Sequence, residues 1–188
     1  MRCRIHHPVE MAQGILGWMD PAELEWLYEV AKRMDSIVEL GCHRGRSTYV
    51  LCAGCQGHNA GHPDGQVYAV DCHWCGTMYP FASEAQHTRP EFDQAVGHFP
   101  NLIALEMNFA EAAVSDLIPA MVDMVFIDGD HAYESVLDDL KTWAPRTKKM
   151  VCGHDLSAET PGVQQALDEY FGPGQVHTGP GKIWYIDK

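Results

Sequence analysis

The stretch VELGCHRGRSTYVL, residues 38–51, places an acid, two glycines and a Ser-Thr pair between an apolar run and a helix-like run. The apolar residues before Gly41 suit a buried strand. Gly41 and Gly45 permit backbone conformations that other residues resist, and residues 46–51 are able to begin a helix. Because free N–H groups gather at a helix N-terminus, this order predicts a cradle for a small charged ligand.

Strand-like and helix-like segments alternate on both sides of this stretch. The predicted strands are 36–41, 67–71, 102–107, 122–130 and 148–155. The predicted helices are 21–34, 46–55, 90–99, 109–118, 133–143 and 162–171. Residues 175–188 suit a closing hairpin with Gly-Pro-Gly at the turn. The order predicts an α/β fold, a doubly wound, mostly parallel seven-stranded sheet with an antiparallel C-terminal hairpin.

The net charge and the length of the apolar runs exclude several classes of function. The chain has 188 residues and a formal net charge of −13, which opposes binding to nucleic acid or to an anionic membrane. No apolar run approaches the roughly 20 residues of a membrane span, and the N-terminus has no apolar signal core. We therefore expect one domain over residues 1–188, with a helical N-terminal segment over about 1–34, in the cytoplasm. A homodimer is possible on general grounds.

Polar side chains stand at the ends of the predicted strands. Glu39, Asp71, Asp128 and Asp155 each end a strand, and Asn108 follows another. Parallel strands bring their carboxyl ends to one edge of a sheet, where ligands of such folds bind. These residues are therefore expected to converge on one site.

The glycine pattern selects between two nucleotide-binding classes. A dinucleotide-binding site typically contains G-x-G-x-x-G. The two glycines separated by one residue at the start of that motif are missing here, which disfavours a dehydrogenase. The pattern of Glu39, Gly41, Gly45, Ser47 and Thr48 resembles motif I of class I S-adenosylmethionine-dependent methyltransferases. The segments VYAVD (67–71), DMVFIDGDHAYESVLDDLKTW (123–143) and VCGHD (151–155) extend the likeness. They resemble the "IDGDHxY" branch, which is related to macrocin-type sugar O-methyltransferases and distantly to the catechol type.

The resemblance implies a Rossmann-like fold and S-adenosylmethionine as cofactor. Its carboxylate would lie near the helix start at Ser47 and Thr48, and its ammonium group near Glu39. Asp71 would accept two ribose hydroxyls. The glycine turn of Gly41 and Gly45 would cradle the ligand.

The remaining cofactor positions lie further along the chain. Asn108 would contact the adenine edge, with Phe109 alongside the ring, although Phe109 suits plain core packing equally well. Asp128 completes the expected cofactor-binding set.

The same resemblance implies a divalent-metal site. The catechol type holds magnesium with acids at the strand ends of Asp128 and Asp155, and oxygen ligands suit Mg²⁺. Leu156 stands where the catechol type has an Asn ligand. His154, Asp130 or water would replace that ligand.

His131 is the expected catalytic base, with Asp128 the second catalytic residue. His131 lies three residues after Asp128, where the catechol type places a lysine base, and a neutral imidazole suits the role. It could instead cap the helix starting at Tyr133. His154 is the reserve base, or a residue that orients Asp155.

Two C-x-x-C pairs have the spacing of a zinc ribbon, namely Cys52/Cys55 and Cys72/Cys75. The predicted fold places them at opposite ends of the domain, so buried thiols are the simpler interpretation. Residues 72–89 have no clear period and suggest a loop or lid.

The sequence thus predicts O-methylation of a small-molecule hydroxyl, such as one on a sugar or natural product. The alternatives are an N- or C-methyltransferase of this fold and a non-catalytic, zinc-stabilised binding module.

Overall fold

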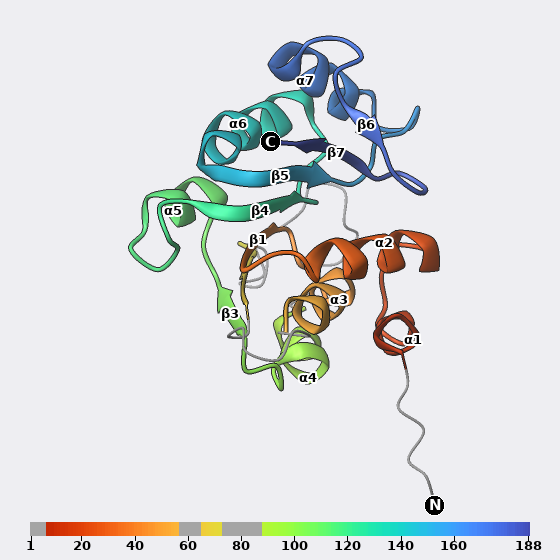
Figure 1. Ribbon diagram of the computed structural model, residues 1–188, viewed down its shortest axis with the longest axis vertical. Coiled ribbons are helices and arrows are strands. Elements are labelled where there is room, and N and C mark those ends of the chain that lie inside the picture. Colours follow the sequence, from red (N-terminus) through yellow and green to blue (C-terminus); the bar gives the residue numbers. More distant parts are fainter. Residues whose placement is uncertain (1–6, 57–64, 73–87) are drawn as a thin grey trace, which may run out of the picture.

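The computed structural model describes residues 7–56, 65–72 and 88–188. A seven-stranded sheet runs through the molecule with helices on both faces (Figure 1). Its helices are α1 (Pro8–Gln13), α2 (Pro21–Ala31), α3 (Arg46–Cys55), α4 (Arg89–Val96), α5 (Phe109–Val114), α6 (Tyr133–Trp143) and α7 (Pro161–Phe171). Its strands are β1 (Ser36–Leu40), β2 (Gln66–Val70), β3 (Leu102–Leu105), β4 (Val122–Ile127), β5 (Thr147–Gly153), β6 (His177–Thr178) and β7 (Trp184–Asp187).

The strand order is β3-β2-β1-β4-β5-β7-β6. Strands β1 to β5 are parallel, and β7 runs antiparallel to β5 and to β6. This confirms the predicted fold class. The chain leaves β1 toward β2 and β3, and later returns to pair β4 with β1. The order therefore reverses between β1 and β4, and such a switch point is where sheets of this kind bind ligands.

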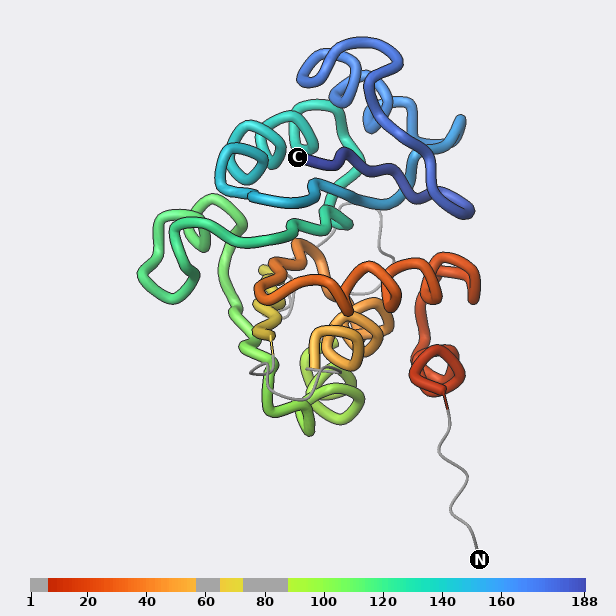
Figure 2. The backbone as a smooth tube through the Cα atoms, viewed as in Figure 1, coloured from red at the N-terminus to blue at the C-terminus, as the bar shows by residue number. Residues whose placement is uncertain are grey.

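Two apolar cores lie against the two faces of the sheet. Helices α1 to α4 contribute to one core, and α5 to α7 contribute to the other (Figure 2). Neighbouring strand residues alternate between them, with Ile37 in the first core and Val38 in the second. Central strands covered on both faces read as continuous apolar runs, which is why β1 and β4 were recognisable from sequence.

Helix α2 begins with a capping box. The Asp20 side chain accepts the N–H groups of Ala22 and Glu23, and the Glu23 carboxylate accepts the N–H of Asp20. Pro21 occupies the first turn, where its missing N–H costs nothing. These contacts confirm the helix start predicted at Asp20-Pro21.

Several boundaries differ from the sequence prediction, and most of the observed elements end earlier than expected. The helix expected over 109–118 ends at Val114, because the Ser115 hydroxyl bonds the Ala112 carbonyl at 2.8 Å and the backbone turns extended there. The fifth strand, expected over 148–155, begins one residue earlier at Thr147 and ends at Gly153. The predicted lid over 72–89 lies almost wholly outside the described residues.

Candidate active site

The loop between β1 and α3 passes directly over the end of β4. Gly41 has a φ of 88°, and a Cβ on it would lie 2.2 Å from the backbone oxygen of Asp128. Gly45, also at φ 88°, directly precedes the first residue of α3. The predicted glycine turn is therefore present, and it brings the α3 N-terminus to the edge where β4 ends.

Glu39 lies inside the fold beneath this loop. It is 0% exposed, and its two carboxylate oxygens accept the hydroxyls of Ser47 at 2.5 Å and Thr48 at 2.6 Å. Burial raises the pKa of Glu39 to about 7, while the two hydroxyl bonds act in the opposite direction. The enclosed carboxylate thus holds the start of α3 to β1, and its contact with the ammonium group of the ligand remains a prediction. The Ser47 and Thr48 hydroxyls likewise point to Glu39, so their part in binding rests on backbone N–H groups.

Glu39→Gln should remove a pH dependence of stability. The folded protein holds the Glu39 proton more tightly than the unfolded chain, so wild-type stability falls as pH rises from 4.5 through about 7. A shift of this size corresponds to about 3 kcal/mol. We therefore compare the free energy of unfolding of the variant and of wild type by urea denaturation. The difference, variant minus wild type, should increase by up to that amount between about pH 5 and about pH 8. Glu134→Gln, at an exposed site on α6, is the control. A constant difference between Glu39→Gln and wild type would contradict the assignment.

Asp71 ties the end of β2 to the same loop. Asp71 is 5% exposed, and its Oδ2 accepts the backbone N–H groups of Cys42 at 2.9 Å and His43 at 3.0 Å. His43 has a left-handed φ of 46°. Asp71 therefore lies at the predicted cradle and shapes it. Its ribose role remains a prediction.

Asn108 and Phe109 lie at the start of α5. The Asn108 side chain is the N-cap and accepts the Glu111 N–H at 2.8 Å. Phe109 packs against the second core, and its ring would be 2.7 Å from a Cβ on Gly129. The packing interpretation of Phe109 is thus supported, and the adenine contacts remain predictions.

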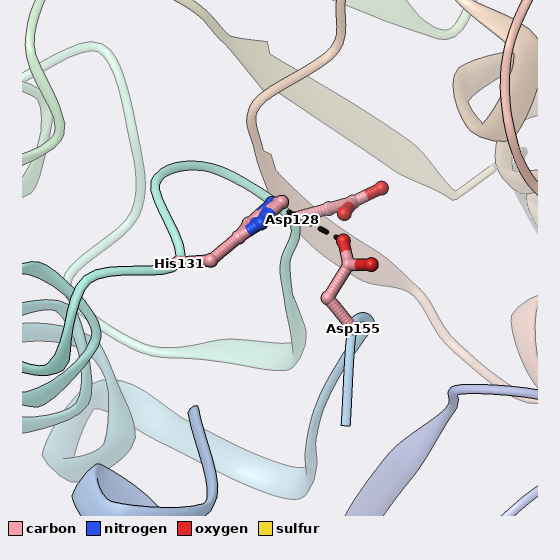
Figure 3. A group of neighbouring side chains, drawn as sticks. All are labelled: Asp128, His131 and Asp155. Atoms are coloured by element: carbon pink, nitrogen blue, oxygen red, sulfur yellow. Dashed lines mark ion pairs between the residues drawn. The ribbon is translucent and has the colours of Figure 1, made fainter. Parts of the chain in front are cut away.

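Three side chains gather beyond β4 and β5 (Figure 3). Asp128, His131 and Asp155 each offer one ligand atom, and these atoms lie within 4.8 Å of one another. His131 Nε2 is 3.1 Å from Asp155 Oδ2. Asp155 has a left-handed φ of 60°, an uncommon conformation that is most frequent for Asp and Asn and that concentrates at functional sites. The pair of strand-end acids is together, as predicted.

His154 lies between two carboxylates. It is 6% exposed, with Nδ1 at 3.1 Å from Asp155 Oδ2 and Nε2 at 3.0 Å from Glu23 Oε1. Its Nδ1 also lies 3.6 Å from Asp128 Oδ1. This geometry fits the expectation that His154 orients Asp155, and its roles as metal ligand or reserve base remain predictions.

The electrostatics of His154 follow from these partners. Burial lowers the pKa of His154, but the hydrogen bonds to Asp155 and Glu23 and the charge of Asp128 outweigh it and raise the pKa to about 10. Burial also raises the pKa of Asp128 to about 7, with the charges of Asp155 and Glu23 adding to it and that of His154 opposing it. The carboxylates of Glu23, Asp128 and Asp155 thus gather around His154, with the Lys182 ammonium 3.7 Å from Asp155 Oδ1.

A small cavity adjoins these groups. Its volume is about 10 Å³, enough for one water molecule or ion, and Asp128, His131, His154 and Asp155 are among its lining residues. The Asp128 and Asp155 carboxylates are oxygen ligands of the kind that Mg²⁺ or Mn²⁺ prefers, and water molecules complete such sites. The residues present therefore fit a divalent metal.

The Cys52/Cys55 pair lies on α3, outside the Asp128 group. Cys52 and Cys55 are buried on α3, and the Cys55 thiol donates to the Met34 carbonyl at 3.2 Å. Burial raises the pKa of the Cys52 thiol well above its usual range. Cys75 lies outside the described residues. Within the part of the chain that the structure describes, the Asp128 group is the only cluster of three potential metal ligands.

The glycine loop, the acids at the strand ends and the strand order together define the class of protein. Residues 38–155 match the family described as "Methyltransferase domain", and the chain belongs to this family. The class predicted from the sequence, the S-adenosylmethionine-dependent methyltransferases, is thereby confirmed. In the described ranges, no helix has the length and apolar character needed to cross a membrane.

A curated protein matches a large part of the chain. The uncharacterized protein y4gI of Sinorhizobium fredii (strain NBRC 101917 / NGR234) is 33% identical over 134 residues, which are 69% of this chain. The chain spans only 14% of the length of that curated relative.

Solved structures share the fold. The O-methyltransferase from Bacillus cereus in complex with SAH aligns with a TM-score of 0.66 at 12% identity, over 99% of this chain and 94% of its own. CalS11, a TDP-rhamnose 3'-O-methyltransferase in calicheamicin biosynthesis, aligns with a TM-score of 0.61 at 16% identity, over 87% of this chain and 76% of its own. The Rossmann-like methyltransferase fold is thus shown.

Proposed function

We propose that the chain methylates a hydroxyl oxygen of a small molecule, such as a sugar or natural product, with S-adenosylmethionine as donor and a divalent cation assisting. The observation that carries this proposal is the group of Asp128, His131 and Asp155 at the sheet edge, directly beside the glycine loop. Two carboxylates that hold a cation, with an imidazole next to them, suit deprotonation of a hydroxyl.

The cofactor would be held by the loop that follows β1. Asp71 would accept the ribose hydroxyls, and the backbone N–H groups at the start of α3 would bind the carboxylate. S-adenosylmethionine supplies an electrophilic methyl group on a sulfonium centre. The φ of 88° at Gly41 and the absence of a side chain there keep this loop close to β4, which supports the fit.

His131 would take the proton of the acceptor hydroxyl. Its side chain is 39% exposed, so an acceptor is able to reach it, and Asp155 Oδ2 lies 3.1 Å from its Nε2. A carboxylate at that distance fixes the ring orientation and stabilises the imidazolium that forms. The cation, bound by Asp128 and Asp155, would lower the pKa of the acceptor hydroxyl.

A screen of acceptors tests the proposal. The purified chain is incubated with S-adenosylmethionine and a panel of sugars, nucleoside-diphosphate sugars, catechols and amines, and released S-adenosylhomocysteine is measured. We expect turnover with a hydroxylated acceptor, a large loss on chelation, and recovery with Mg²⁺ or Mn²⁺. Turnover with amines alone would favour the N-methyltransferase alternative, and a rate indifferent to chelation would remove the metal.

Asp71→Ala gives the matching test of the cofactor site. Removing a charged acceptor of two N–H groups should weaken S-adenosylhomocysteine binding, measured by calorimetry, by about 10- to 100-fold. Asp168→Ala, a change on the outer part of α7, is the control and should bind as wild type does. Unchanged binding by Asp71→Ala would contradict its place in the cofactor site.

A further inference from the structure

Glu23 is a buried acid that the reaction outlined above does not use. It is 3% exposed at the start of α2, and burying a carboxylate is costly unless it is well paired. Its carboxylate accepts three hydrogen bonds, from the Asp20 N–H at 2.6 Å, the Lys182 N–H at 2.8 Å and His154 Nε2 at 3.0 Å.

The two oxygens of Glu23 have separate tasks. Oε2 accepts the Asp20 N–H and completes the helix cap, whereas Oε1 accepts from Lys182 and His154. Helix capping therefore needs only one oxygen. The turn before Lys182 is also shaped around the other oxygen, because a Cβ on Gly181 would lie 2.2 Å from Oε1.

His154 connects Glu23 to the catalytic group. Its Nε2 faces Glu23 and its Nδ1 faces Asp155 Oδ2 at 3.1 Å, the same oxygen that lies 3.1 Å from His131 Nε2. Since carboxylates only accept, both nitrogens of His154 donate, and the ring is an imidazolium held between two acids. The result is one continuous chain of contacts, Glu23 to His154 to Asp155 to His131.

We propose that Glu23 is a positioning residue, which through His154 holds the Asp155 carboxylate toward His131 and Asp128. This rests on the proposed function, because it assigns Asp155 to the base and to the cation. Asp155 needs such support for two reasons. Its backbone is left-handed at φ 60°, and the Lys182 ammonium, 3.7 Å from Oδ1, draws the carboxylate the other way.

The supporting residue also relieves a repulsion. Asp128 and Asp155 bring two carboxylates into one small space, and like charges there oppose each other. His154 Nδ1 lies 3.6 Å from Asp128 Oδ1 as well as 3.1 Å from Asp155 Oδ2. A His154 ring held in place by Glu23 therefore presents its Nδ1 to both acids at once.

Glu23→Gln in the full chain tests the proposal, with Asp20→Ala as matched control. Both variants weaken the same capping box, but only the first removes the charge that faces His154. Mn²⁺ binding is followed by electron paramagnetic resonance, and the ring ¹⁵N signals of His131 are followed by NMR. Groups that contact a metal ligand directly, as His154 contacts Asp155, typically change metal affinity about 10- to 100-fold. Glu23 acts one contact further out, so Mn²⁺ should bind to Glu23→Gln about 10-fold more weakly, at the lower end of that range. The His131 signals should also move, although Glu23 does not touch His131.

The control and the second variant keep the outcomes separate. Asp20→Ala should match wild type in both readouts, and an equal loss of Mn²⁺ binding in both variants would overturn the proposal by assigning the effect to α2 alone. Equal Mn²⁺ affinity in Glu23→Gln and wild type would also overturn it. If wild type binds no Mn²⁺, the metal part of the proposed function fails, and the His131 signals then decide whether Glu23 positions the dyad. Glu23→Asp, which keeps the charge but shortens the reach, replaces the neutral variant if that variant does not fold, with the same losses expected.

Discussion

Gly41→Ala is expected to abolish measurable cofactor binding and to lower the free energy of unfolding by about 3 kcal/mol. A Cβ at this position would lie 2.2 Å from the backbone oxygen of Asp128, and a φ of 88° is unfavourable for any residue with a side chain. Backbone atoms of β4 and of the loop must then separate, which displaces Asp128 and the start of α3 together. Urea denaturation measures the stability, and calorimetry with S-adenosylhomocysteine measures binding.

Gly174→Ala separates the two causes. Gly174 also has a positive φ, 71°, but a Cβ there would meet nothing within 4 Å. Gly174→Ala should lower the free energy of unfolding only through the left-handed backbone conformation, by about 1 kcal/mol. Cofactor binding should be unchanged. A Gly41→Ala protein as stable as Gly174→Ala, with normal binding, would show that the loop does not need its close approach to β4.

His131→Ala should lower turnover by about 10²- to 10⁴-fold, the usual contribution of a positioned base. The His131 ring contacts Asp155 at 3.1 Å and is partly exposed at the sheet edge, so its loss removes proton acceptance without opening the core. S-adenosylhomocysteine binding should stay close to wild type, which places the loss in the chemical step. The measurement is the initial rate with the acceptor found in the screen.

His177→Ala is the control for this substitution. His177 is exposed on β6 and stacks near Tyr185, with ring centroids 5.2 Å apart. Removing it should leave the rate unchanged. Full turnover by His131→Ala would mean that another group takes the proton, because the start of α6 has Ala132 as N-cap and no side-chain cap for His131 to supply.

Much of the fold was predictable from local patterns. The apolar runs of β1 and β4, the glycine turn after residue 40 and the cap at Asp20 each depend on neighbours within a few residues, so their sequence signals are strong. The acids at the strand ends were predictable too, because all parallel strands of a sheet end at the same edge. Helix α5 was overestimated at its C-terminal end, where the Ser115 hydroxyl competes with the backbone.

The contact partners of the site residues were harder to predict from the sequence. Glu39 was placed correctly at the end of β1, but its direction depends on which helix covers that face of the sheet. Its neighbours in the sheet, Ala69 and Phe126, belong to the core under α1 to α4. Glu39 therefore points toward α3 and accepts the hydroxyls of Ser47 and Thr48.

The sequence by itself determined the class of protein and the edge of the sheet where its site lies, because these follow from hydrophobic periodicity and from motifs of a few residues. Only the tertiary structure decided that Asp155 bonds both His131 and His154, and that Glu23 stands behind His154 across 131 positions of chain. Contacts over such separations arise from how helices pack on the sheet, and no local pattern in the chain records them.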